Sequence, residues 1–340
     1  MASDNKKVTV GIISLGDMGS GLARLLVAHG YPVTTNVEGR SSDTLTRAQE
    51  AGATLLPTDE ALVSASDIIL SVVPPRDALA TAQRILTALT TLSPARTTPL
   101  YFADMNAVSP SSLKAIASIF HSLPPDTLRF IDGSILGGPP SPPSTSTSPP
   151  APKSDSDSDF PTWKRPLLPT SGPHPISSLS PHLAAVLNTK HISPDLGAAS
   201  GLKMCFASFG KGFAAIAVQA VTTAKRLGVL DELKCALGEI APGNLERMER
   251  SVVGMAPKAY RWVREMEEIS ATHAGVDEGD SMFAPEYIFK GAAEVFRLVA
   301  EDTVLGKEKV GKRERGTNAD EVADAIIEGL REKRRKKSEE

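Results

Sequence analysis

The chain has 340 residues, of which 41% are hydrophobic, and a formal net charge of −3 at pH 7. This length allows two domains, and the charge does not favour a surface that binds nucleic acid or an anionic membrane. The two cysteines, Cys205 and Cys235, exclude a disulfide framework and show no metal-ligand spacing, so we expect a cytoplasmic protein without a bound metal. We find no secretory signal and no apolar run of membrane-spanning length, so we expect no membrane contact.

The amino-terminal segment predicts a dinucleotide site. An apolar run at Val8–Ser14 leads into closely spaced glycines, a helical pattern follows, and a second apolar run occupies Pro32–Val37. A strand, a glycine turn and a helix in this order place a pyrophosphate at the helix N-terminus. The expected cofactor contacts in the turn are Ser14, Leu15, Gly16, Asp17, Met18 and Gly19. Ser14 stands where the first glycine of G-x-G-x-x-G would fall, and a structural turn in another α/β sheet is the alternative.

The residues after the second predicted strand bear on the choice of cofactor. An acid there would bond the ribose hydroxyl of NAD, whereas an arginine would favour the 2′-phosphate of NADP. Both Glu38 and Arg40 occur, but Arg40 is followed by Ser41 and Ser42, which add donors that suit a phosphate. We therefore expect NADP, with NAD as the second choice. A solvated Arg40 without a cofactor role is the alternative interpretation.

Strands and helices alternate over about the first 135 residues. Further strands are predicted at Ile68–Val73, Leu100–Asp104 and Arg129–Asp132, with helices at Asp77–Leu89 and Ser111–Phe120. Several strands are continuous apolar runs, which is typical of a parallel sheet covered on both faces. The predicted fold class is therefore α/β, with a Rossmann-type doubly wound parallel sheet that binds ligands beyond the carboxyl ends of its strands.

Three strand ends carry candidate contacts. Val73 and Pro74 form either an apolar wall for the nicotinamide ribose or only a strand stop. Asn106 follows the next strand and is expected to contact both cofactor and substrate. Expected substrate contacts after the last of these strands are Ser134, Leu136 and Gly137.

Pro139–Asp159 interrupts the alternation. It holds seven prolines, seven serines, two threonines and three aspartates, without a hydrophobic period. Such a segment buries too little apolar surface to offset its ordering entropy, so we interpret residues 139–160 as a disordered insertion. A phosphorylated regulatory segment is the alternative, because Ser154, Ser156 and Ser158 alternate with acids. One more strand is predicted at Lys164–Pro169.

From about Leu196 onward the pattern is helical. Helices are predicted at Gly197–Leu227, Leu230–Ala241, Asn244–Met255, Tyr260–His273 and Pro285–Asp302. We predict a dinucleotide-binding domain at residues 1–175, an all-helical domain at 176–328 and a basic tail at 329–340. The cationic run Arg331–Lys337 is interpreted as a solvated helix end, with a nuclear-localisation or nucleic-acid patch as the alternative.

The long predicted helix supplies a candidate proton-transfer group. Lys203 stands among small and apolar residues near the helix start, and Lys211 lies eight residues on, near the same face. A general acid or base for hydride chemistry is a group of this kind. Spacing alone, however, favours a lysine without a catalytic role.

Four segments together resemble the β-hydroxyacid dehydrogenase family, which includes 3-hydroxyisobutyrate dehydrogenases and the cofactor domain of 6-phosphogluconate dehydrogenase. The family's G-x-I-G-L-G-x-M-G opening is resembled by Gly11–Gly19, and its second conserved segment by Asp104–Pro110. Its D-x-P-V-S-G-G segment is resembled by Asp132–Gly138, and its G-x-G-x-x-x-K segment by Gly197–Lys203. The resemblance implies that Lys203 is the general acid/base. The remainder resembles the short helical domain of a branch labelled 6-phosphogluconate dehydrogenase-like, and the family implies a homodimer formed through this domain.

Two departures from the family pattern concern the substrate. Leu136 stands where family members usually have a serine that holds the substrate carboxylate, and Ala207 stands where they have an asparagine. Without such donors a pocket holds a carboxylate poorly, so we expect a bulkier or less polar substrate, or an anion held by Lys211 or Asn106. The sequence thus predicts an NADP-dependent oxidoreductase acting on a small molecule with a carbonyl, hydroxyl or imine group. A non-catalytic NADP(H)-binding sensor or scaffold is the alternative.

Overall fold

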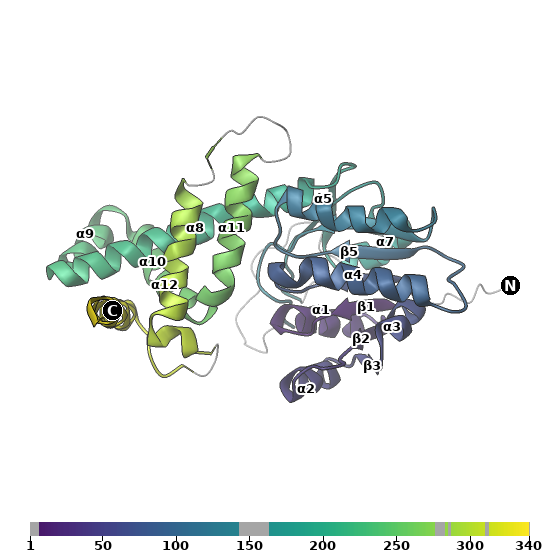
Figure 1. Ribbon diagram of the computed structural model, residues 1–340, viewed down its shortest axis with the longest axis horizontal. Coiled ribbons are helices and arrows are strands. Elements are labelled where there is room, and N and C mark those ends of the chain that lie inside the picture. Colours follow the sequence, from purple (N-terminus) through teal and green to yellow (C-terminus); the bar gives the residue numbers. More distant parts are fainter. Residues whose placement is uncertain (1–6, 143–162, 276–282, 285–286, 310–312, 340) are drawn as a thin grey trace, which may run out of the picture. The chain divides into compact units, whose positions relative to one another are not determined.

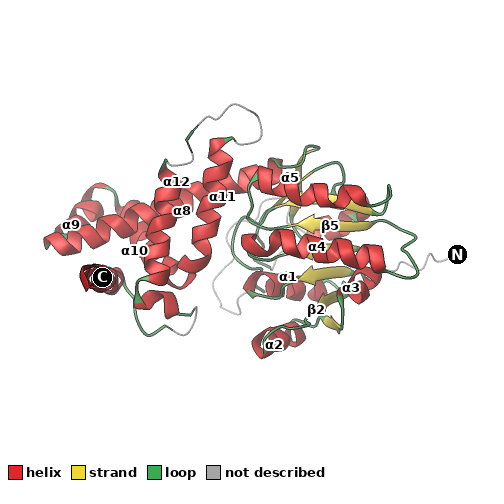
Figure 2. Cartoon of the chain, in the orientation of Figure 1, coloured by secondary structure: helices red, strands yellow, loops and turns green. Residues whose placement is uncertain are grey.

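The structure, a computed structural model, describes residues 7–142, 163–275, 283–284, 287–309 and 313–339. They form two compact units, Met1–Lys203 and Met204–Glu340. The first unit contains a sheet and helices, and the second is built of helices (Figure 2).

The first unit is organised around an eight-stranded sheet in the order β3-β2-β1-β4-β5-β6-β7-β8. The strands are β1 (Val10–Ile13), β2 (Val33–Asn36), β3 (Thr54–Leu56), β4 (Ile68–Ser71), β5 (Leu100–Asp104), β6 (Leu128–Gly133), β7 (Leu168–Ser171) and β8 (Thr189–Ser193). Neighbouring strands are parallel except β6 and β7, which are antiparallel. The strand order reverses between β1 and β4, the position at which doubly wound sheets bind their ligands.

Helices cover both faces of this sheet (Figure 1). They are α1 (Asp17–Ala28), α2 (Ser42–Glu50), α3 (Asp59–Ala65), α4 (Pro75–Thr91), α5 (Pro110–Ser118), α6 (Ile176–Leu179) and α7 (Pro181–Val186). Ile12 packs in one core cluster with Leu22 of α1, whereas its neighbour Ile13 packs in a second cluster with Leu62 of α3 and Ile85 of α4. Because both faces of the sheet are buried, consecutive strand residues are apolar. The Rossmann-type α/β fold is therefore confirmed.

The five strands and two helices predicted before residue 135 are present, with ends that differ by at most two residues. Two edge strands were not predicted, because β3 has only three residues and β8 is mostly polar and mostly exposed. The strand predicted at Lys164–Pro169 is misplaced. Regular pairing begins only at Leu168, while Lys164 and Leu167 form isolated bridges.

The helix α8 (Ala198–Leu227) begins in the first unit and continues into the second. The division at Lys203 differs from the predicted domain limit at residues 175 and 176, because β8 and the start of α8 group with the sheet. Within the predicted insertion, Ser141 pairs with Lys164 in an antiparallel bridge. Residues 143–160 of that insertion, including its serine–acid alternation, lie outside the described residues.

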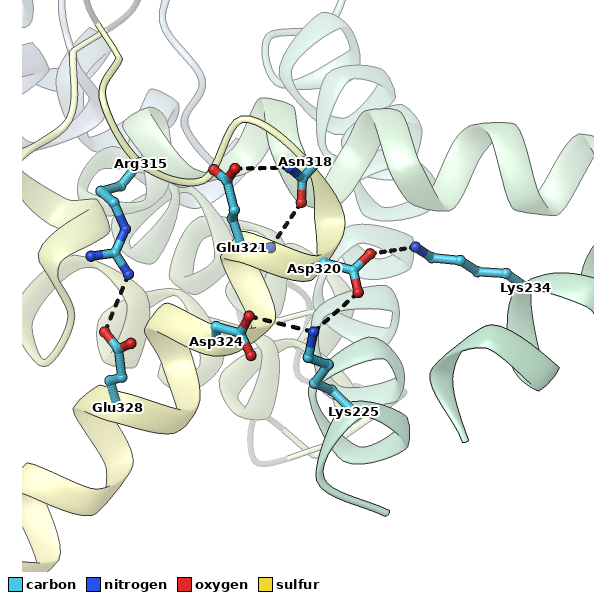
Figure 3. A network of polar contacts seen from close by, with 8 residues as sticks. All are labelled: Lys225, Lys234, Arg315, Asn318, Asp320, Glu321, Asp324 and Glu328. Atoms are coloured by element: carbon cyan, nitrogen blue, oxygen red, sulfur yellow. Dashed lines mark hydrogen bonds and ion pairs between the residues drawn. The ribbon is translucent and has the colours of Figure 1, made fainter. Parts of the chain in front are cut away.

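The second unit contains most of α8 together with α9 (Leu230–Ile240), α10 (Pro242–Met255), α11 (Ala259–Ala274), α12 (Ile288–Glu301) and α13 (Ala319–Glu339). The run Arg331–Lys337 forms the exposed end of α13. Figure 3 shows how the first turns of α13 are held: Asp320 accepts hydrogen bonds from Lys225 of α8 and Lys234 of α9, and Asp324 pairs with Lys225 at 3.4 Å.

Among the described residues, α8 is the helix that is long and apolar enough to cross a membrane, by length and composition alone. This corrects the expectation that no such run exists. Within an 18-residue apolar window of this helix, 50% of the window is buried inside the structure. Alanines and valines such as Ala214, Val218 and Val221 are buried, and the same residue types make α8 apolar enough to satisfy this criterion.

Candidate functional site

The turn between β1 and α1 keeps the shape of a dinucleotide turn despite its serine. Ser14 adopts a φ of +75°, the left-handed conformation that favours glycine. A Cβ atom on Gly19 would lie 2.1 Å from the carbonyl oxygen of Ser14. Gly19 therefore allows α1 to pack directly on the turn, and Ser14 adopts the left-handed conformation although it is not a glycine.

The N-terminus of α1 leaves room for an anion. Gly16 is its N-cap residue, and no side chain caps the helix. A Cβ atom on Gly16 would have no heavy atom within 4 Å, so there is open space beside the N-cap residue. A pyrophosphate fits this combination of uncapped amides and open space. Of the other predicted contacts, Leu15 is buried beneath the turn, Met18 is half-buried and Asp17 is exposed.

An arginine that the sequence analysis did not single out supports this turn. Arg47 of α2 donates from Nε to the carbonyl oxygen of Leu15 at 3.0 Å and from Nη2 to Thr44 Oγ1 at 3.2 Å. The contact joins the glycine turn to α2. Arg47 gave no sequence signal, because an arginine within a polar helix is ordinarily a solvated surface charge.

The two residues considered for contact with the adenosine ribose both lie on the surface. Glu38 and Arg40 are exposed, two and four residues beyond the end of β2. Ser41 is the N-cap residue of α2, and its hydroxyl lies 3.2 Å from that of Thr44. Arg40 and Ser41 therefore stand together at the start of a helix, where an anion is favoured.

Asn106 ties two strand ends together. Its Oδ1 accepts from the amide of Val73 at 2.7 Å, and its Nδ2 donates to Ser71 Oγ at 3.2 Å. The side chain is 2% exposed. The structure thus brings the predicted contacts Val73, Pro74 and Asn106 together, with Asn106 holding the segment that begins α4. Their direct contact with cofactor or substrate stays a prediction.

The ends of β5 and β6 carry two buried acids. Asp104 and Asp132 are register partners on these strands, and both are fully buried. Burial raises the pKa of Asp104 to about 7, and the neighbouring Asp132 contributes in the same direction. Burial also raises the pKa of Asp132, whereas the hydroxyls of Ser200 and Ser171 act the other way.

Asp132 is the anchor of α8, and the sequence analysis did not assign it a role. Its carboxylate accepts from Ser171 Oγ at 2.7 Å, from Ser200 Oγ at 2.6 Å and from backbone amides at the start of α8. The available signal was a charged residue directly after the apolar pair Phe130 and Ile131 near the end of β6. It was overlooked because the glycines of the same segment suggested a substrate contact.

Lys203 reaches the end of the sheet. Its Nζ donates to the carbonyl oxygen of Ile135 at 2.6 Å, two residues beyond β6. Nearby, Ser134 is fully buried, and its hydroxyl donates to the carbonyl oxygen of Ala199 at 2.7 Å. The structure therefore brings Lys203 to the segment predicted to hold the substrate, although Ser134 itself binds α8.

Leu136 and Gly137 follow directly. The backbone of Leu136 exchanges hydrogen bonds with Leu167 at 2.8 and 3.0 Å, so the Leu136 amide is already used. Gly137 is exposed with a φ of +131°, a conformation that favours glycine. The accessible part of this predicted substrate segment is thus Gly137 and the half-buried side chain of Leu136.

The remaining two predicted substrate contacts belong to the second unit. Ala207 is 7% exposed. Lys211 forms a hydrogen-bonded ion pair with Glu265 of α11, and its Nζ lies 5.8 Å from the ring centroid of Trp262. The charge of Lys211 is thus already balanced inside this unit, which argues against its predicted role as the anion site.

Comparisons with known proteins agree with this geometry. Residues 9–141 match the model of the NAD binding domain of 6-phosphogluconate dehydrogenase, and residues 224–299 match a domain of unknown function, DUF1932. No curated protein matches the chain.

Among solved structures, the 3-hydroxyisobutyrate dehydrogenase of Mycobacterium tuberculosis is 16% identical, with a TM-score of 0.61 over 96% of this chain and 99% of that one. The 3-hydroxyisobutyrate dehydrogenase of Salmonella typhimurium is 18% identical, with a TM-score of 0.61 over 93% and 99%. The reductive aminase of Aspergillus terreus is 17% identical, with a TM-score of 0.50 over 96% and 100%. At these identities the likeness concerns the fold.

The glycine turn, the open helix N-terminus and the matched residues describe the same NAD(P)-binding domain. Residues 9–141 therefore form an NAD binding domain of the kind found in 6-phosphogluconate dehydrogenase, and the helical domain DUF1932 follows at residues 224–299.

Proposed function

We propose that this chain is an NAD(P)-dependent oxidoreductase that uses Lys203 as general acid/base. The observation that supports it most directly is the 2.6 Å hydrogen bond from Lys203 Nζ to the carbonyl oxygen of Ile135. This bond holds an ammonium group at the carboxyl edge of the sheet that carries the glycine turn. Doubly wound sheets bind their ligands at this edge.

In the reductive direction, a carbonyl or imine carbon gains a hydride and its oxygen or nitrogen gains the proton of the Lys203 ammonium group. In the oxidative direction, neutral Lys203 removes the hydroxyl or amine proton as the hydride leaves the carbon. The nicotinamide supplies or accepts the hydride when the cofactor is bound. Proton transfer of this kind requires the donor within hydrogen-bond reach of the reacting atom.

We propose NADP as the preferred cofactor. Arg40 and Ser41 support it, because they stand together at the N-terminus of α2, where a 2′-phosphate would find a cation, a hydroxyl and backbone amides. The exposed Glu38 is the residue that would instead accept the ribose hydroxyl of NAD.

The substrate is proposed to be a small carbonyl or imine compound without a tightly held carboxylate. Leu136 offers no side-chain donor, Ala207 is apolar, and Lys211 is paired with Glu265. We include imines among the candidate substrates because a reductive aminase shares the fold.

A homodimer formed through the helical unit is also proposed. Along α8, Phe206, Phe209 and Ile216 are 58%, 77% and 61% exposed. Their spacing of three and seven residues places them on one face, and such an apolar stripe is costly in water. A second copy of this chain would bury it. We expect Phe209→Glu to reduce the mass measured by light scattering to that of one chain.

The alternative function, a non-catalytic NADP(H) sensor or scaffold, is favoured by the same absence of polar side chains at Leu136 and Ala207. A screen separates the two. The full chain is incubated with NADPH and aldehydes, keto acids or preformed imines, and loss of nicotinamide absorbance is followed against Lys203→Ala. Substrate-dependent oxidation that falls at least about 100-fold in the variant supports the enzyme. Tight NADPH binding without oxidation by any compound supports the sensor.

A further inference from the structure

The start of α8 is built on the carboxylate of Asp132. Its Oδ2 accepts from the amides of Gly197 at 2.9 Å, Ala199 at 3.1 Å and Ser200 at 3.1 Å. The side chain is 0% exposed. The first amides of a helix lack partners within the helix, and a negative charge beside them complements the helix dipole. Asp132 therefore caps α8 from the sheet.

Two more contacts join the same stretch of chain to α8. Ser134 Oγ donates to the carbonyl oxygen of Ala199, and Lys203 Nζ donates to the carbonyl oxygen of Ile135. Residues 132–135 thus hold residues 197–203 at three points. Lys203 lies one helical turn beyond Ala199, so any displacement of the first turn carries the lysine with it.

We propose that Asp132 is a positioning residue, which sets the location of the Lys203 ammonium group through the N-terminus of α8. The inference rests on the proposed acid/base role of Lys203. Asparagine at this position would carry no negative charge. Toward the backbone amides of α8 it would present either its own NH2 group, which cannot accept a hydrogen bond, or its amide oxygen, which is a weaker acceptor than a carboxylate. The first turn would then move to find other partners. Misplacement of a proton donor by about 1 Å is enough to lower the rate substantially.

The test compares Asp132→Asn and Ser200→Ala with the control Asp195→Asn. Asp195 is an exposed acid just before α8, so its substitution makes the same charge change without touching the helix amides. The first readout needs no substrate: the rate at which acetic anhydride acylates Lys203, followed by mass spectrometry against pH. The second is kcat and KM for NADPH and for the substrate found in the screen.

For Asp132→Asn we expect the acylation rate of Lys203 to change at least about threefold with a shifted pH profile. We expect kcat to fall at least about tenfold, while the NADPH dissociation constant stays within about twofold of the wild type. Ser200→Ala, which removes one hydroxyl donor, should shift both quantities in the same direction by less. Asp195→Asn should match the wild type.

Unchanged Lys203 reactivity in folded Asp132→Asn would overturn the proposal. If Asp132→Asn does not fold, Ser200→Ala decides, and wild-type reactivity and kcat in that variant would likewise overturn it. The acylation measurement also distinguishes failure of the positioning role of Asp132 from failure of the proposed oxidoreductase function. A chain without oxidoreductase activity contradicts the proposed function, whereas the dependence of Lys203 reactivity on Asp132 is still measured.

Discussion

Asp104 and Asp132 are register partners on β5 and β6, yet their carboxyl groups have opposite surroundings. Hydroxyls and helix amides surround Asp132. Asp104 Oδ1 accepts a hydrogen bond from the amide of Asn106 at 3.0 Å, and Asp104 Oδ2 has no hydrogen-bond partner in the described part of the chain. Burial disfavours the charged form of Asp104, and the neighbouring Asp132 carboxylate raises the pKa of Asp104 in the same direction.

Asp104→Asn should change how stability depends on pH. Burial raises the pKa of Asp104 from 3.8 to about 7, so the folded state holds a proton that the unfolded state has lost between those values. The wild type therefore loses stability as pH rises from about 4 to 7, by about 4 kcal/mol, and no more above that. The free energy of unfolding in urea, measured at pH 5 and pH 8, should differ less in Asp104→Asn.

The control for this experiment is Asp43→Asn, which removes an exposed acid at the start of α2. It should leave the difference between the two pH values as in the wild type. An Asp104→Asn variant with an unaltered pH dependence would show that Asp104 is already ionised near pH 5.

Arg40→Ala should weaken NADPH binding selectively. Loss of a cation beside the 2′-phosphate is expected to raise the NADPH dissociation constant about 10- to 100-fold, because a charge-assisted hydrogen bond contributes about 1.5–3 kcal/mol. NADH, which lacks this phosphate, should bind as before. Fluorescence titration with both cofactors measures the ratio, and equal losses for the two would remove Arg40 from cofactor selection.

Gly19→Ala should disrupt the cofactor turn. The new Cβ would stand 2.1 Å from the carbonyl oxygen of Ser14, so α1 and the turn must separate. We expect a loss of unfolding free energy of about 1–3 kcal/mol and at least a tenfold weaker affinity for NADPH. Gly243→Ala on α10 is the matched control, because nothing lies within 4 Å of its added Cβ. If Gly19→Ala bound NADPH like the wild type, the close approach would be unimportant.

Asp320→Asn should loosen the attachment of α13 shown in Figure 3. A hydrogen bond from Lys234 and one from Lys225 lower the pKa of Asp320 below 3.8. The stabilisation is therefore present above the unfolded pKa and is lost as pH falls through the folded value. Because the side chain of Asp320 is 38% exposed, we expect a loss below about 1 kcal/mol at pH 7 and low salt.

Thermal unfolding at pH 7, repeated at pH 3 and in high salt, measures this effect. The difference between Asp320→Asn and the wild type should become smaller under the latter two conditions. Glu332→Gln, which changes an exposed acid on the same helix, should show no such pattern. A difference that persists at pH 3 would point to packing instead of charge.

The sequence by itself determined the inner strands from β1 to β6, the glycine turn and the helical second unit, whereas the inner strand β7 was misplaced. These follow from local causes: apolar runs produce strands buried on both faces, and a strand followed by Gly16 and Gly19 produces the turn onto α1. The proposed role of Lys203 has a different origin, since the family resemblance, and not its spacing, suggested it. The edge strands β3 and β8 were missed because β3 has only three residues and β8 is mostly polar and exposed.

Only the tertiary structure decided how the candidate site is held together. Asp132 accepts from the amides of residues 197, 199 and 200, Asn106 accepts from the amide of Val73, and Arg47 donates to Leu15, in each case across a long stretch of chain. Lys211, a candidate anion site in the sequence, is paired with Glu265. Hydrogen bonds and ion pairs depend on distances of about 3 Å between residues far apart in the chain. Such distances exist only once the sheet and helices have packed, and no periodicity in the sequence records them.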